Sequence, residues 1–188
     1  MDATTRRVQL LDSAGTGATV VHLQADGTPP RAVAILAQHL RVLSFVIGRS
    51  DAAPSDALTG EIVNAIGEHT QEGVGVIADA TAADAALALA SARPELVRAL
   101  ALVAPRAPRR AFAELQTPVL ALFGTRQNAT QMPRAMREAI ANCNVVFVYD
   151  ADQDMANGRP EAVAAVLREF LLAGDRFLVS GKSGKLYP

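Results

Sequence analysis

The feature that most constrains the fold of this chain is a repeated alternation between short, almost wholly apolar runs and helix-like stretches of about ten to fifteen residues. Apolar runs without a polar face are typical of strands buried on both sides of a parallel sheet, and the stretches between them are typical of crossover helices. The sequence therefore predicts an α/β fold with a mostly parallel central sheet and helices on both faces. The predicted strands are 7–12, 18–24, 41–48, 73–77, 97–104, 119–123 and 145–149, and the predicted helices are 32–40, 56–70, 81–92, 132–141 and 159–172.

The length of 188 residues and the hydrophobic content of 50% suit one compact domain, which we expect to span 1–172. A turn signal over 14–17 predicts a hairpin between the first two strands. Glycine and serine residues predict a loosely ordered tail over 173–188. In a sheet of this class, ligand sites lie beyond the carboxyl ends of the strands, so we expect the functional site in the strand-to-helix loops.

The charge balance excludes several classes of partner. The chain has 18 Lys plus Arg and 19 Asp plus Glu, so its net charge is -1 and it lacks the basic field that binds a nucleic-acid backbone or an anionic membrane. Its single cysteine, Cys143, cannot form an internal disulfide, and no apolar run reaches the roughly 18 residues of a spanning helix. With no secretory signal expected, the sequence predicts a cytoplasmic protein that contacts neither nucleic acid nor membrane.

Four segments resemble, in order, the sequence landmarks of the α/β-hydrolase fold family. TVVHLQADG (19–27) resembles the strand and oxyanion loop, and VGVIADATAADAALALASARPELVRALALVAP (74–105) resembles the strand, nucleophile turn, helix and next strand. TPVLALFGTRQ (117–127) resembles the strand before the catalytic acid, and VVFVYDADQDMANGRPEAVAAVLREFL (145–171) resembles the last strand, the histidine loop and the terminal helix. The resemblance extends over almost the whole chain and implies the fold of this family.

The resemblance also implies that the catalytic triad of the family is lost. It places Ala80 at the nucleophile position, Gln127 at the acid position and Gln153 at the histidine position. A methyl group cannot attack a carbonyl carbon. An amide is not a general base near neutral pH, and it carries no charge to stabilise an imidazolium.

The oxyanion region departs from the family in the same way. Gln24 and Ala25 stand where the family has His-Gly, Asp26 follows them, and Thr81 follows the nucleophile position. A carboxylate at Asp26 would oppose a developing oxyanion rather than stabilise it. An intact scaffold with these losses indicates a non-catalytic homologue.

The chain also lacks the helical cap that many family members insert before the acid strand. The connection 106–117 has the length of an ordinary loop, which predicts no cap domain and an open, shallow face over the site. We expect this homologue to act by binding, through that face, a protein partner or a second copy of itself, or else a ligand. The predicted binding face comprises Asp79, Asn128, Asp154 and Met155.

Two other interpretations remain open. The first is a hydrolase that uses Thr81 as a displaced nucleophile, with Asp79 or Asp154, on a small ester, thioester or lactone; the plainer role of Thr81 is a helix N-cap. Asp79 lies one residue before the nucleophile position, which directs its side chain away from the site. The second is a small-ligand sensor that kept the pocket of the family and not its reaction.

No metal or cofactor is expected. The three histidines, His22, His39 and His69, share no spacing with a metal-binding motif, and one cysteine cannot form a cysteine cluster. His22 lies between two apolar residues in a predicted strand, so we interpret it as a hydrogen-bonded core or edge histidine.

Overall fold

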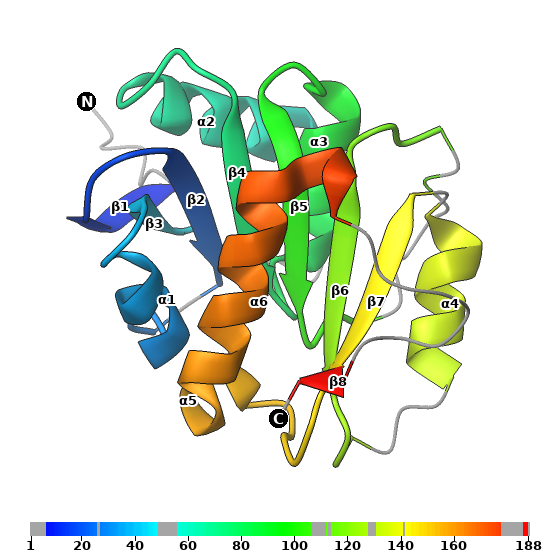
Figure 1. Cartoon of the computed structure of the whole chain (residues 1–188). Helices are drawn as coiled ribbons and strands as arrows, with labels where there is room; N and C mark the ends of the chain where they lie inside the picture. Colours follow the sequence, from blue (N-terminus) through cyan, green and yellow to red (C-terminus); the bar gives the residue numbers. More distant parts are fainter. Residues whose placement is uncertain are drawn as a thin grey trace.

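The computed structural model describes residues 7–25, 27–48, 56–106, 112, 114–127, 131–140, 142–177 and 186–187. One eight-stranded sheet has the order β1-β3-β2-β4-β5-β6-β7-β8, and helices lie on both of its faces (Figure 1). The strands are β1 Gln9–Ala14, β2 Thr19–Gln24, β3 Arg41–Val46, β4 Val74–Asp79, β5 Val97–Val103, β6 Val119–Gly124, β7 Cys143–Val148 and β8 Leu186–Tyr187. The helices are α1 Arg31–Leu36, α2 Asp56–Gly67, α3 Ala83–Ala92, α4 Gln131–Ala139, α5 Met155–Gly158, α6 Pro160–Ala173 and the short 3₁₀ helix η1 Gly174–Arg176.

The sheet is mostly parallel, as the apolar runs predicted. All strand pairs from β3 through β8 are parallel, and only β1 runs antiparallel, against β3. The strand-to-helix loops at the carboxyl ends of the central strands therefore gather along one edge of the sheet. The predicted α/β class, with helices on both faces, is confirmed.

Each face of the sheet has its own apolar core, which explains why the central strands show no polar face. Side chains of α2, α3 and α4, with Ile62 and Met136 among them, pack against one face. Side chains of α1, α5 and α6, with Leu36 and Phe170 among them, pack against the other. Within β6, Phe123 points to the first core and Leu122 to the second. No helix in the described part of the chain has both the length and the apolar character of a membrane span.

The predicted hairpin between the first two strands is wrong. β1 pairs with β3, and β2 lies between β3 and β4. The connecting glycines do adopt positive φ, at 78° for Gly15 and 98° for Gly17, but they do not form a tight reversal. A Cβ on Gly15 would lie 2.2 Å from the Ala37 carbonyl oxygen and 2.1 Å from that of Leu40, so the connection runs against the end of α1. Gly15 is therefore needed for a close approach to the backbone at the end of α1, not for a hairpin turn. The crossover through α1 places β3 between β1 and β2.

The C-terminal segment differs from the expected loose tail at two places. The Phe177 ring is 5% exposed and meets the Phe170 ring edge-on, with the centroids 5.3 Å apart. β8 adds to the sheet edge beside β7, where Phe147 pairs with Leu186. Residues 178–185 and 188 lie outside the described part. One aromatic residue and a short strand therefore attach a glycine-rich segment to the domain.

Candidate functional site

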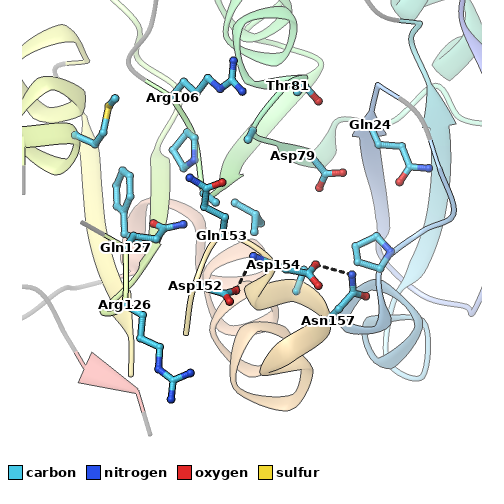
Figure 2. A pocket seen from close by; sticks show the side chains of 18 of the residues that line it. Gln24, Asp79, Thr81, Arg106, Arg126, Gln127, Asp152, Gln153, Asp154 and Asn157 are labelled. Carbon is cyan, nitrogen blue, oxygen red and sulfur yellow. Dashed lines mark hydrogen bonds between the residues drawn. The ribbon is translucent and has the colours of Figure 1, made fainter. Parts of the chain in front are cut away.

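The carboxyl ends of the central strands line an open cavity of about 760 Å³ (Figure 2). Its walls come from the ends of β2, β4, β5 and β6, the loop after β7, and α5. This is the edge at which the sheet class predicted a ligand site. Of the residues singled out from sequence, Gln24, Asp79, Ala80, Thr81, Gln127, Gln153 and Asp154 line the cavity.

The other predicted site residues do not line it. Ala25 and Met155 are buried in the protein, at 6% and 0% exposure, and Met155 belongs to the core beneath α5 and α6. The prediction that Met155 contributes to a binding face is therefore wrong, because it is the inward-facing residue of α5. Asp26 and Asn128 lie outside the described residues.

The turn that carries Ala80 is relaxed. It links β4 to α3, and the Ala82 amide donates to the Asp79 carbonyl over 2.9 Å, which closes an ordinary β-turn. Among the non-glycine residues that the structure describes, only Ala104 and Asp150 have positive φ, so Ala80 does not. Position 80 therefore carries a methyl group on an ordinary turn.

Gln127 closes the loop after β6. The side-chain oxygen of Gln127 accepts a hydrogen bond from the backbone amide of Gly124 over 3.2 Å. The backbone amide of Gln127 donates to the Gly124 carbonyl over 3.1 Å. Gly124 itself has no room for a side chain, because a Cβ would lie 2.1 Å from the Ala151 carbonyl oxygen. This close approach brings the loop after β6 against the loop after β7. Gln127 and Gln153 thus reach the same cavity from neighbouring loops.

The loop after β7 is held by its own polar side chains. The Asp152 carboxylate accepts from the Asp154 amide over 2.9 Å, and the Asp154 carboxylate accepts from the Asn157 side chain over 2.7 Å. Asn157 in turn accepts from the Arg31 amide over 3.0 Å, which ties the loop to the start of α1. Gln153, exposed at the tip, makes no hydrogen bond within the described part of the chain. The two aspartates therefore build the loop rather than pair with each other for acid-base work.

In the predicted oxyanion region, the side chain of Gln24 forms a hydrogen bond within its own loop. The Gln24 side chain is 1% exposed and donates through Nε2 to the Gly27 carbonyl over 2.8 Å. Gly27, with φ at 87°, makes the turn that this bond closes. This bond uses one of the two amide hydrogens of Gln24 within the loop.

Thr81 is exposed and lines the cavity, but it does not cap α3. The helix begins two residues later than predicted, at Ala83, and its N-cap is Ala82, which makes no side-chain capping bond. The predicted N-cap role of Thr81 is therefore wrong. Its hydroxyl has no hydrogen-bond partner among the described residues, so no base is in place to activate it.

Asp79 points into the cavity, so the expectation that its side chain faces away is wrong. Figure 2 shows its carboxylate at the end of β4, directed into the space between Gln24 and Gln153. Its Oδ1 lies 3.3 Å from Nε2 of His22, whose side chain is 0% exposed, whereas that of Asp79 is 33% exposed. Nδ1 of His22 is buried and has no hydrogen-bond partner among the described residues. The interpretation of His22 as a hydrogen-bonded core histidine is confirmed.

The cavity contains an excess of carboxylates. Asp79, Asp152 and Asp154 line it together with Arg106 and Arg126. Arg126 is ion-paired outside the cavity lining, because its Nη2 lies 2.5 Å from the Asp150 carboxylate. Within the described residues, no group of three or more His, Cys, Asp or Glu side chains is arranged to hold a metal ion.

Several lining residues were missed from sequence. They lie at strand ends, in the segments after them or in the following helices, and were not among the predicted site residues: Thr28, Pro30, Val103, Ala104, Pro105, Arg106, Phe123, Arg126, Met132, Asp152, Ala156 and Asn157. The available signal was positional, because every strand-end loop of a parallel sheet contributes to the same edge. Which of those residues turn inward was decided by the order of the strands.

Comparison with known proteins identifies the architecture. No protein-family model matches the chain, and no curated protein matches it. Among solved structures, an α/β-hydrolase enzyme from a sediment metagenome of the Mar Chica lagoon in Morocco superposes with a TM-score of 0.71 at 12% identity, covering 87% of this chain and 94% of that one. A serine hydrolase involved in carbazole degradation gives 0.70 at 15% identity, with 85% and 93% covered. The enol-lactonase of Burkholderia xenovorans gives 0.68 at 15% identity, with 88% and 96% covered.

These likenesses extend over most of this chain and of each matched structure. At such low identity they concern the backbone and not the chemistry. The chain has the α/β-hydrolase fold.

Proposed function

We propose that this protein binds a small molecule in the cavity at the carboxyl edge of its sheet and does not hydrolyse it. The observation that carries the proposal is the shared location of Ala80, Gln127 and Gln153 in one cavity, with Ala80 on a relaxed turn. A cavity of about 760 Å³ has the size of a ligand site. A lining that mixes polar side chains with apolar ones such as Phe123 and Met132 suits a small molecule better than the flat face of a protein partner.

A second candidate is a hydrolase that acts through unusual groups. The names of the structural neighbours favour it, since they describe a hydrolase, a serine hydrolase and a lactonase. In this chain Thr81, Asp79 and Asp154 would have to supply the chemistry, and all three line the cavity. The substrate would be a small ester, thioester or lactone. Against it, the Thr81 hydroxyl has no described hydrogen-bond partner to accept its proton.

One experiment separates the two candidates. The purified protein is incubated with a fluorophosphonate probe and its intact mass is measured, while a panel of p-nitrophenyl esters, a thioester and a lactone is assayed for turnover. A serine hydrolase of the same fold is the positive control. Ligand binding without hydrolysis predicts no adduct and no turnover. A stoichiometric adduct that disappears in Thr81→Ala, together with turnover that the same change abolishes, would establish the hydrolase.

Binding itself is tested by thermal unfolding against a library of small molecules. A ligand at about one hundred times its Kd stabilises the folded state by about 2.7 kcal/mol, a readily measured shift in the melting temperature. The matched variant is Ala80→Leu, which fills the cavity from the end of β4 and should remove the shift. A shift that survives this change would place the ligand elsewhere and contradict the proposal.

A further inference from the structure

We infer that Asp79 is the ligand-contacting anion of this cavity, that His22 is the residue that positions it, and that the pair selects a ligand with a cationic nitrogen donor such as an amidinium or an ammonium group. The inference rests on the proposed function, because it names the ligand class for the same cavity. It starts from a polar side chain that the fold leaves unexplained. His22 occupies a central strand among apolar neighbours. Its imidazole is fully buried, and one of its nitrogens is paired with no residue that the structure describes.

The geometry specifies the protonation state of the pair. An ionised carboxylate only accepts hydrogen bonds, so the bond between His22 Nε2 and Asp79 Oδ1, at 3.3 Å, requires the proton to be on Nε2. A second proton on Nδ1 would be a buried donor with no acceptor in the described part of the chain, and it would add a buried charge; both features are costly. His22 is therefore the neutral Nε2–H tautomer. In that state His22 positions the Asp79 carboxylate through a hydrogen bond and leaves its negative charge uncompensated.

The pairing depends on the register of two neighbouring strands. In the parallel pair of β2 and β4, His22 lies opposite Ile77, two residues before Asp79 at the end of β4. From this position the imidazole reaches the carboxylate from inside the protein and holds one oxygen. The Asp79 side chain is one-third exposed, so its other oxygen faces the cavity. A carboxylate fixed on one side and open on the other is prepared to accept donors from a ligand.

The charges around Asp79 favour a cation. Asp152 and Asp154 also line the cavity. Each accepts a hydrogen bond within the loop after β7 through one carboxylate oxygen. Among the lining cations, Arg126 is paired with Asp150, and Arg106 makes no ion pair with a described residue. Apart from neutral His22, no described residue pairs with Asp79. A ligand amidinium would supply this missing charge and a charge-assisted hydrogen bond.

The test uses three probes of one shape: benzamidine as the cation, benzamide as the neutral form and benzoate as the anion. Binding is followed by ¹H–¹⁵N NMR titration of the full chain. We expect benzamidine to bind and to shift the amides of 79–82, with affinity lowered about tenfold by Asp79→Asn, the loss expected for one charge-assisted bond. Asp12→Asn, which removes the same charge from exposed β1, should leave the affinity unchanged.

The positioning role of His22 has its own readouts. Long-range ¹H–¹⁵N spectra should show the neutral Nε2–H tautomer in the wild type and a changed pattern in Asp79→Asn. His22→Leu should weaken benzamidine binding while the fold persists in thermal unfolding. His22→Gln, whose side-chain Nε2 can donate to the carboxylate, should restore part of the affinity. A purely structural histidine would give equal stability losses in both variants and no difference in binding.

Three outcomes would overturn the inference: the Nδ1–H tautomer, benzamidine binding that Asp79→Asn does not weaken, or no binding of benzamidine. If benzoate or benzamide binds in the cavity instead, and no probe ester turns over, the proposed function stands and only the ligand class is wrong. If Thr81-dependent turnover is found, the proposed function fails independently of these titrations.

Discussion

At the scale of single residues, the proposed binding without hydrolysis depends on Ala80. Introducing the missing hydroxyl with Ala80→Ser should produce no esterase activity above the parent protein. The serine would stand on a turn without positive φ, and Gln153 and Gln127 would supply neither base nor acid. The check is hydrolysis of p-nitrophenyl acetate together with fluorophosphonate labelling. Measurable turnover from this single change would show that the position assigned to the nucleophile functions as one.

Cys143 shows at the same scale how burial determines reactivity. It is half-buried at the start of β7, and this burial raises the pKa of its thiol to about 12, against the opposing charge of Arg137. The thiolate is the reactive form, so at pH 8 iodoacetamide should label the native protein about a thousandfold more slowly than the urea-unfolded chain. Mass spectrometry over time measures both rates. Equal rates would show that the thiol is accessible and ionises normally.

The raised pKa of Cys143 also predicts how the stability of the protein changes with pH. Because the pKa of Cys143 is higher in the folded state than its ordinary value of 9.0, the folded protein keeps a proton that the unfolded chain loses. The free energy of unfolding should therefore fall as the pH rises from 9 toward 12, with no contribution from this group below pH 9. Urea titrations compare the wild type with Cys143→Ala. The variant should lose less stability across this window, and an identical pH dependence would contradict the assignment.

At the scale of elements, replacing glycine by alanine should have opposite effects on stability at two positions, Gly124 and Gly60. Gly124 ends β6 with the Ala151 carbonyl where a Cβ would be, whereas Gly60 lies within α2 with nothing within 4 Å of such an atom. Gly124→Ala should cost more than about 2 kcal/mol through forced backbone movement. Gly60→Ala should stabilise the protein by about 0.5–1 kcal/mol, because alanine favours helix. Chemical denaturation measures both. Similar effects for the two variants would mean that the loops after β6 and β7 are not in close contact.

At the scale of the whole molecule, the ring of Phe177, just after α6, packs on the folded domain. Phe177→Ala removes a nearly buried ring that packs edge-on against Phe170 and should cost about 3 kcal/mol in unfolding free energy. Leu172→Ala, at a residue 55% exposed on α6, is the matched control and should change stability by less than about 0.5 kcal/mol. Thermal and urea unfolding compare the two. If Phe177→Ala left the unfolding free energy unchanged, the Phe177 ring would not contribute to the core of the domain.

The sequence by itself determined the fold class and the main elements, although it predicted neither α5 nor β8. Apolar runs and helical periodicity are local properties, and they located every predicted strand and helix to within a few residues of the bounds described here. The order of the family-like segments also indicated which positions would meet, and Ala80, Gln127 and Gln153 do share one cavity. That agreement holds because strand ends in a parallel sheet meet at one edge whatever their exact order.

Only the tertiary structure decided which strands are neighbours and which side chains turn inward. Strand pairing is set by contacts between residues far apart in sequence, so a glycine turn signal could not distinguish a hairpin from a crossover that places β2 beside β4. The same pairing brought His22 to Asp79, turned Asp79 into the cavity and buried Met155. It also gave Phe177 a partner in Phe170. These outcomes depend on packing across the sheet, which no local pattern contains.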